Sequence, residues 1–498
     1  MRLVALAVSL LGITAGAAQA TGLPVVVVPG LTLADLPRLE ERGAVGLLVP
    51  GAGPETNRAV ALASLERGAV RNSLRGGAPG GPRLVEARTG PLAAAPGIYL
   101  GLPEGGAQPN DRRYPVVVVG EGWSGVLASS TTRIDGLVSV ADLAPAARGE
   151  GPLRAEPRPA AADALLALDR RIRAAGEARM PVLLASCAAV AAAAVAVPAA
   201  AAAALALVLL ANLALGLAGL ASVSVVVPVL VAAAAAATVV GGRFRTGLLA
   251  GTVAAYLLAL AAAGEAVALS PLGPTQNARF YGLSNLLATL LLVPALGGAL
   301  LAWRRWGAVA GTAVAGAALV AVAASRLGAD GGGAIVLAVG LAVLAVLAAG
   351  ASRRALAAAV GAALAGVVLL VALDAATGGE SHVTRALGGG PVGVARELAG
   401  RVALTVERLA HQPLRAVVVV LLAGVLAWLV ARTLRAVPRR EVALPLAVVG
   451  ALAASLVVND SPFEVLLAGV ASYLVATGLS PATAAPPNRR GARGGRLA

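Results

Sequence analysis

The feature that most constrains this chain is a succession of apolar stretches that starts near Pro181 and continues almost to the C-terminus. Each stretch has about 17 to 24 residues, close to the ~20 that an α-helix needs to cross ~30 Å of hydrocarbon. The 498 residues are 58% hydrophobic and 13% charged, against roughly 25% charged in average soluble proteins. One aqueous core cannot hide this much apolar surface. We therefore predict a polytopic α-helical membrane protein.

About eleven transmembrane helices are expected within residues 179–480. The expected spans are 181–197, 199–220, 222–240, 246–268, 285–302, 308–325, 334–350, 355–373, 414–431, 442–458 and 464–479. The first three stretches run together, so Pro198 and Pro228 mark either helix boundaries or kinks. Small residues within the spans, such as the pairs Gly247/Gly251 and Gly311/Gly316, predict close contacts between helices.

The chain before the spans has a different composition. Residues 1–20 combine one Arg, a short apolar core and the small-x-small end Ala18-Gln19-Ala20, which predicts a secretory signal peptide. The alternative is an uncleaved anchor helix, and either one would export the segment that follows.

Residues 21–178 alternate short strand-like runs with helical patterns and predict a small extracytoplasmic α/β domain with parallel strands. Strands are expected at Pro24–Val28, Val45–Val49 and Pro115–Val119. Helices are expected at Leu33–Arg42 and Glu55–Arg67, with a charged juxtamembrane helix over Ala160–Ala178.

The distribution of arginine predicts the orientation in a plasma membrane. With the N-terminal domain outside, the cytoplasmic loops and the tail at 481–498 hold fourteen Arg and one acid, Glu441. The opposite loops of the membrane domain hold seven Arg and seven acids, as the positive-inside rule requires. Four arginines just before the first span depart from the rule: Arg170, Arg171, Arg173 and Arg179. The signal sequence and the five basic clusters outweigh them, so we predict a disordered, basic cytoplasmic tail.

Composition also excludes several classes of site. The net charge of +15 does not indicate nucleic-acid binding, because the arginines cluster at helix ends and not along one groove-sized face. Cys187 is the only cysteine, and neither His382 nor His411 stands in a metal-ligand motif. We therefore expect no metal, no cofactor and no nucleic-acid partner, and the lipid bilayer is the one certain environment.

Four polar segments interrupt the Ala/Val/Leu background of the membrane domain, and the expected topology places all four on the external side. They are Gln276–Asn285, Gly328–Gly333, Glu380–Arg385 and Val458–Pro462, which we call the polar islands. Ionisable groups at a membrane boundary are costly unless they are paired or solvated, so clusters of them are candidates for function. We expect the four islands to converge on one site.

The islands supply all candidate site residues. Substrate-binding candidates are Gln276, Asn277, Arg279, Tyr281, Asn285, Arg385 and Asn459, and catalytic candidates are Asp330, Asp460 and His382. Arg279 and Arg385 suit a phosphate or carboxylate, because guanidinium groups bind these anions bidentately. The aspartates suit acid–base chemistry and His382 proton transfer. The alternatives are structural ion pairs for Arg279, Asp330 and Asp460. For Tyr281 the alternative is an interfacial anchor, and for His382 a solvated loop histidine.

Two further patterns favour structural readings. The segment Val392–Leu409 has apolar residues at helical spacing, which predicts an amphipathic helix along the membrane surface. Gly331–Gly333 is not a phosphate-binding loop, because no strand precedes it and no lysine follows it.

The N-terminal domain has a resemblance of its own. Val25–Leu31, Leu36–Leu39 and Gly43–Leu48 resemble the opening strand and helix of alkaline-phosphatase-like domains, and Gly136–Pro145 is similar to a late segment of that superfamily. Pro29 stands where family enzymes carry an Asp, and the domain has no His. The resemblance therefore implies a short, degenerate and non-catalytic relative. The membrane half looks like multi-spanning proteins of GC-rich Gram-positive bacteria.

These observations lead to one functional expectation and two alternatives. We expect a cell-envelope protein whose external face binds an anionic or lipid-linked glycan or phosphate. The first alternative is a membrane-embedded glycosyl- or phosphotransferase at the outer surface. The second is a transporter or flippase for a lipid-linked substrate, disfavoured because few polar residues lie in mid-span.

Overall fold

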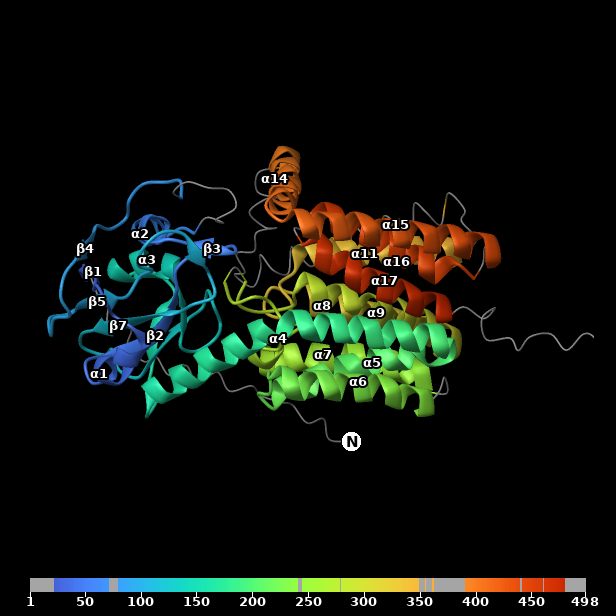
Figure 1. The fold of residues 1–498 in the computed structure, drawn as a ribbon, viewed down its shortest axis with the longest axis horizontal. Helices are drawn as coiled ribbons and strands as arrows, with labels where there is room; N and C mark the ends of the chain where they lie inside the picture. Colours follow the sequence, from blue (N-terminus) through green and yellow to red (C-terminus); the bar gives the residue numbers. More distant parts are fainter. Residues whose placement is uncertain are drawn as a thin grey trace, which may run out of the picture. The chain divides into compact units, whose positions relative to one another are not determined.

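The computed structural model describes residues 22–70, 79–240, 244–277, 279–348, 354, 361, 390–438, 441–459 and 461–479. Contacts divide the chain into two compact units between Asp169 and Arg170. Figure 1 labels the elements of both units, and each unit is described by itself below.

One mixed sheet of eight strands forms the first unit. Its strands are β1 Val25–Val27, β2 Ala44–Val49, β4 Ala87–Thr89, β5 Gly97–Leu100, β7 Tyr114–Val119, β8 Val126–Ser129, β9 Leu137–Ser139 and β10 Leu153–Glu156. The order is β10-β8-β2-β7-β5-β1-β4, and β9 also pairs with β2. A separate two-stranded ladder joins β3 Glu55–Thr56 to β6 Gln108–Pro109. All three expected strands are present, as β1, β2 and β7.

The expected parallel arrangement is wrong at the centre of the sheet. β7 runs antiparallel to both of its neighbours, β2 and β5, whereas β1 is parallel to β4 and β5. The chain between β5 and β7 forms no helix and only the short strand β6. A parallel crossover needs a dozen or more residues and usually a helix, so the chain turns back and pairs with the strand that it has just left.

Short helices connect these strands. They are η1 Leu33–Asp35, α1 Leu36–Glu40, α2 Arg58–Arg67, η3 Val140–Asp142 and α3 Leu143–Ala147. The helix expected from Glu55 begins three residues later, because Asn57 caps α2 by accepting a hydrogen bond from the Val60 amide at 2.9 Å. Side chains of Leu48, Ile98 and Val116 are fully buried in the core of this unit.

The second unit is a bundle of helices, most of them apolar. They are α4 Ala161–Ala196, which begins in the first unit, η4 Pro198–Ala200, α5 Ala201–Leu217, α6 Val223–Val240, α7 Arg245–Ala268, α8 Asn285–Leu290, α9 Leu292–Trp306, α10 Ala308–Ala323, α11 Gly331–Ala348, α14 Gly390–Ala410, α15 Pro413–Ala436, α16 Ala443–Val458 and α17 Pro462–Gly478. Pro198 is a helix boundary, whereas Pro228 lies inside α6.

The helix lengths fit a membrane protein. Among the described residues, six helical segments are long and apolar enough to cross a membrane, and four shorter apolar helices accompany them. Every expected span except 355–373 overlaps a described helix, and nearly all of 355–373 lies outside the described residues. The chain is therefore an α-helical protein with helices suited to a bilayer and an N-terminal α/β region.

Small residues bring the helices of the bundle together, but mostly at positions other than those expected. A Cβ atom at Gly247, Gly251 or Gly316 would meet no atom within 4 Å. Gly311 of α10 does pack closely, because a Cβ atom there would lie 2.6 Å from Cβ of Trp303. At Gly340 of α11 a Cβ atom would lie 3.0 Å from Leu296 of α9. The sequence spacing of small residues therefore did not identify the contact faces.

The amphipathic helix α14 has a direction different from its neighbours. Figure 1 shows α14 almost end-on, whereas α15, α16 and α17 run across the view. Val402 and Val406 on α14 are 44% and 60% exposed. The expected amphipathic helix over Val392–Leu409 is therefore present, and part of its apolar face is not covered by described residues.

Candidate functional site

The first and second polar islands meet through Arg279 and Asp330. Arg279 lies in the loop between α7 and α8, and its Nη2 donates a hydrogen bond to the Gly328 carbonyl at 2.7 Å. Its Nη1 lies 3.6 Å from Oδ1 of Asp330, the residue that immediately precedes α11. The Arg279 side chain is 29% exposed and that of Asp330 only 6%. One edge of the guanidinium thus holds the Asp330 loop while part of the group stays accessible.

Asp330 has one carboxylate oxygen without a partner. Its Oδ2 is buried and accepts no hydrogen bond from a described residue. A Cβ atom at Gly333 would lie 2.5 Å from this oxygen, so only glycine leaves room for the carboxylate at the start of α11. An unpaired buried carboxylate oxygen is costly, which makes it a candidate for a functional role.

The fourth island reaches the same place through Asn459. A Cβ atom at Gly332 would lie 2.8 Å from Oδ1 of Asn459 and 3.5 Å from Oδ1 of Asp330. Asn459 follows α16, is 3% exposed and donates through Nδ2 to Oγ of Ser455 at 2.7 Å. Gly332 therefore gives space for two polar side chains from different islands to approach each other. Sequence analysis expected this convergence, and the described parts of three islands show it.

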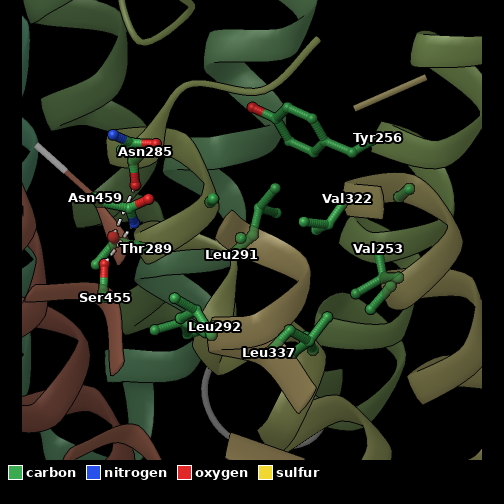
Figure 2. A pocket seen from close by; sticks show the side chains of 16 residues that line it. Val253, Tyr256, Asn285, Thr289, Leu291, Leu292, Val322, Leu337, Ser455 and Asn459 are labelled. Atoms are coloured by element: carbon green, nitrogen blue, oxygen red, sulfur yellow. Dashed lines mark hydrogen bonds between the residues drawn. The ribbon is translucent and has the colours of Figure 1, made fainter. Parts of the chain in front are cut away.

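A small and mostly apolar hollow, part of it open to the outside, lies beside this cluster. Figure 2 shows Asn285, Thr289, Ser455 and Asn459 gathered on one side of it, with Leu291, Leu292 and Leu337 forming apolar walls. The residues that line it are Val253, Tyr256, Asn285, Ala288, Thr289, Leu291, Leu292, Ala295, Ala318, Ala321, Val322, Gly333, Val336, Leu337, Ser455 and Asn459.

Most polar groups of the hollow already have partners. Oγ1 of Thr289 donates to the Asn285 carbonyl at 2.7 Å, and the Tyr256 hydroxyl donates to the Leu209 carbonyl at 3.0 Å. The Asn285 side chain is half-buried where it lines the hollow.

The remaining candidate residues have other positions. Gln276 donates through Nε2 to the carbonyls of Ala268 at 3.0 Å and Pro274 at 3.3 Å, so its amide holds its own loop. Asn277 and Tyr281 belong to the same loop and do not line the hollow. Asp460, His382 and Arg385 lie outside the described residues.

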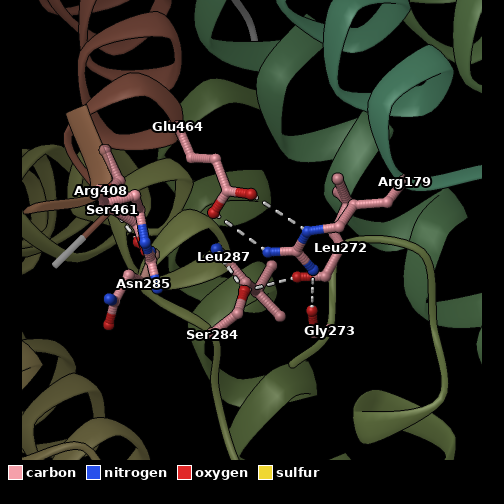
Figure 3. Close-up of polar contacts among 10 residues, drawn as sticks. Arg179, Leu272, Gly273, Ser284, Asn285, Leu287, Arg408, Ser461 and Glu464 are labelled. Atoms are coloured by element: carbon pink, nitrogen blue, oxygen red, sulfur yellow. Dashed lines mark hydrogen bonds and ion pairs between the residues drawn. The ribbon is translucent and has the colours of Figure 1, made fainter. Parts of the chain in front are cut away.

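Sequence analysis missed two ion pairs made by arginines of α4. Arg179 meets Glu464 of α17 through two contacts of 3.2 Å, Nε to Oε1 and Nη2 to Oε2, and its Nη1 donates to the Gly273 carbonyl (Figure 3). Arg171 lies 3.8 Å from Glu265 of α7 and donates to the Gly216 carbonyl at 2.7 Å. The sequence did give a signal for these ion pairs, because Arg171 and Arg179 depart from the positive-inside rule in the expected topology. An arginine at the external end of a helix is stabilised by an acidic partner.

Sequence analysis also missed three residues of α14 that contact the fourth island. Arg401 donates to the Val458 carbonyl at 3.2 Å, Thr405 to the Asn459 carbonyl at 3.4 Å, and Arg408 to Oγ of Ser461 at 3.2 Å. Positions 401, 405 and 408 lie on one face of a helix. The spacing of these polar residues was visible in the sequence, but the surface that they contact was not.

Three arginines contact the loops of the polar islands. Arg279, Arg401 and Arg408 bring three guanidinium groups to the loops around Asp330 and Asn459, and guanidinium donors match phosphate and carboxylate oxygens. Within the described ranges, no group of three His, Cys, Asp or Glu side chains is arranged to hold a metal ion.

The segments of the first unit that resemble phosphatase-like domains form β1–α1–β2 and β9–η3–α3. In the second segment Asp142 is buried and accepts hydrogen bonds from Oγ of Ser129 at 2.9 Å and from the Ser139 amide at 3.0 Å. Burial raises the pKa of the Asp142 carboxyl, although these hydrogen bonds lower it. Asp142 therefore holds the start of η3 in place.

Comparison of the chain with protein families, with curated proteins and with solved structures gave no match.

Proposed function

We propose that this chain is a cell-envelope membrane protein that binds an anionic or lipid-linked glycan or phosphate where the polar islands meet. The observation that carries the proposal is the meeting of Arg279, Asp330 and Asn459 beside an apolar hollow. Arginine is suited to the anion, and the hollow to an apolar part of the same ligand. The N-terminal α/β unit would act as a recognition or docking module.

Charge complementarity supports an anionic ligand. Arg279 is partly accessible, and its ion pair with Asp330 fixes the guanidinium before any ligand arrives. Arg401 and Arg408 add positive charge from α14. A preformed arrangement of donors reduces the entropy lost on binding, which favours a specific anion over a diffuse surface interaction.

The test uses the full chain in lipid nanodiscs and a radiolabelled polyprenyl phosphate. Arg279→Gln should weaken binding by roughly tenfold or more, because a hydrogen bond to a charged group contributes roughly 1.5–3 kcal/mol. Arg304→Gln is the matched control, since Arg304 is an exposed arginine at the end of α9. Equal binding by wild type and both variants would reject the site.

A second candidate function follows from Asp330. Its buried Oδ2 without a hydrogen-bond partner is suited to a general base in a glycosyl- or phosphotransferase. Asp330→Asn keeps the size of the side chain and removes its basicity. A transferase would lose turnover of a lipid-linked substrate in this variant while it retains substrate binding, whereas a binding protein would show no turnover in either form.

A further inference from the structure

We propose that the outer face of helix α14 docks into the interfacial layer of the lipid bilayer, and that lipid on this face holds the fourth polar island in place. The sequence pattern predicted a surface helix, but it did not show which face of the helix meets the protein. The inference goes beyond the proposed function, because its partner is the bilayer and it needs no particular ligand.

Polar side chains of α14 face the protein. Arg401, Thr405 and Arg408 are half-buried, and they donate hydrogen bonds to the fourth island at 3.2, 3.4 and 3.2 Å. A surface helix in water has the opposite arrangement, with apolar side chains toward the core and polar side chains outward. The polarity of α14 is therefore reversed.

The other face of α14 is an exposed apolar stripe. Its members are Ala399, Val402, Ala403, Val406 and Ala410. At about 100° per residue, these positions lie together on the side of the helix opposite to positions 401, 405 and 408. A helix with its polar groups turned toward the protein and its apolar side chains outward is suited to hydrocarbon and not to water.

The direction and position of α14 fit the plane of a membrane surface. Figure 1 shows α14 almost end-on at the side of the bundle, beside the left ends of α15, α16 and α17, which run across the view. Its contacts with Val458, at the end of α16, and with Ser461, just before α17, place it at the level where these helices end. Apolar helices of membrane length end near the membrane surface, so a helix that crosses them at this level lies along the interface.

The exposed stripe of α14 is followed by a second exposed apolar surface on α15. Only His411 and Gln412 separate the two helices. Helix α15 exposes Leu414, Val417 and Leu421, and it is one of the six described helices that are long and apolar enough to cross a membrane. Hydrocarbon is the environment that suits α15, and the same environment accounts for the outer face of α14.

Helix α14 therefore links the bilayer to the fourth island. Burial of apolar side chains in the lipid interface stabilises a helix in proportion to the apolar area removed from water. The opposite face of the same helix donates to the carbonyls of Val458 and Asn459 and to Oγ of Ser461. Docking of α14 in the bilayer thus fixes the position of these acceptors.

The test measures the surroundings of single nitroxide labels in the full chain reconstituted in nanodiscs. Cys187→Ala gives a background without cysteine, and the labels are attached at Val402→Cys, Val406→Cys, Leu421→Cys and the exposed loop position Thr275→Cys. Power saturation compares collisions with oxygen, which concentrates in lipid, and with a water-soluble nickel chelate. The ratio of oxygen to nickel collisions at Val402 and Val406 should exceed that at Thr275 by at least about threefold. Leu421 should give the highest ratio, because it lies roughly 12 Å along α15 from Pro413.

Two results would overturn the docking of α14 in lipid. A ratio at Val402 and Val406 equal to that at Thr275 would show that the outer face meets water. Few collisions with either reagent would show that protein covers this face, either a second copy or another segment of this chain.

A charge on the stripe tests the link between lipid and the fourth island. With the label at Val402→Cys, Val406→Asp should lower the collision ratio at least about twofold, because a charge in the interface is unfavourable, whereas the matched control Val406→Leu should leave it unchanged. Val406→Asp should also speed hydrogen exchange of the Asn459 amide, which donates to the Ser455 carbonyl at 2.9 Å, at least about twofold over Val406→Leu. An unchanged ratio in Val406→Asp would overturn the docking, and unchanged exchange would overturn the link to the island.

Discussion

Gly332 and Gly333 leave space for two polar side chains at the start of α11. The run Gly331–Gly333 did not predict a phosphate loop, and the structure gives it another use. The two absent Cβ atoms leave room for the side chains of Asp330 and Asn459 beside the first turn of α11. The sequence showed that glycine was present, but only the distances to side chains from other segments showed why it is needed.

Gly333→Ala should destabilise the protein. Alanine is favoured over glycine in a helix by about 1 kcal/mol, but overpacking costs about 1–3 kcal/mol, and the new Cβ would lie 2.5 Å from Oδ2 of Asp330. Overpacking should therefore prevail, and thermal unfolding in detergent should show a lower melting temperature. Gly316→Ala is the control, because its Cβ meets no atom within 4 Å and should be neutral or stabilising. A Gly333→Ala protein as stable as this control would contradict the geometry.

Asp142→Asn should stabilise the first unit at neutral pH. Burial raises the pKa of Asp142, so the folded state disfavours its charge. The stability that protonation contributes is fully present below the unfolded pKa and is lost as pH rises through the folded pKa. Asparagine can still accept from Ser129 and Ser139 without the charge.

The measurement for Asp142 is urea-dependent proteolysis of the first unit in the full-length protein between pH 4 and pH 8. The stability advantage of Asp142→Asn should grow as pH rises. If the difference in stability between Asp142→Asn and wild type is constant with pH, or largest at pH 4, burial of the Asp142 charge does not destabilise the folded state.

At the scale of elements, α4 explains the exception to the arginine asymmetry. Arg171 and Arg179 lie on the wrong side of the expected topology, yet they pair with Glu265 and Glu464. The carboxylate of the partner offsets the positive charge of each arginine. The positive-inside rule counts residues along the sequence, and it cannot see pairs between helices that are far apart in sequence.

The Arg179–Glu464 pair should contribute measurably to the packing of α4 against α17. Its two side chains are 12% and 21% exposed and meet through two contacts, so a double-mutant cycle with alanine should give a coupling of about 1–3 kcal/mol. The Arg171–Glu265 pair is the control on the same helix. Its atoms are 3.8 Å apart and its side chains 23% and 45% exposed, so we expect a coupling below about 1 kcal/mol. Equal couplings would mean that geometry and burial do not set the difference.

At the scale of the whole bundle, the polar islands and several arginine pairs lie at opposite ends of the helices. Glu265, Asn285, Asp330 and Asn459 lie at the helix ends joined by the contacts of the polar islands. Arginines occupy the opposite ends of the same or neighbouring helices: Arg245 at the start of α7, Arg304 and Arg305 at the end of α9, and Arg432 and Arg435 at the end of α15. Asn459 and Ser461 lie at the island end.

Cysteine labelling tests the orientation directly. Cys187 is the only cysteine and is buried, so Cys187→Ala provides a clean background. In intact cells, a membrane-impermeant thiol reagent should label Thr275→Cys and His411→Cys, which are exposed at the island end. Arg305→Cys and Arg435→Cys should react only after permeabilisation. Labelling of both pairs from the same side would reject the two-sided arrangement.

Much of the fold could be predicted because its signals are local. The lengths of the apolar stretches predicted α5, α7, α11 and the other long helices, and the valine-rich runs predicted β1, β2 and β7. The site was predicted in part: Arg279, Asp330 and Asn459 do come together, whereas Gln276 uses its amide in its own loop. The partners Arg401 and Arg408 were missed, because nothing near them in the sequence shows what they contact.

The sequence by itself determined that this is a helical protein with membrane-length apolar segments and an N-terminal α/β region. These properties depend on hydrophobicity and charge along the chain, which need no knowledge of distant contacts. Only the tertiary structure decided that β7 is antiparallel, that Gly340 and not Gly247 lies at a helix contact, and that a hollow lies beside Asp330. The direction of β7, the helix contact at Gly340 and the hollow all depend on which segments, far apart in the sequence, pack together. The sequence of one segment does not show which other segment it contacts.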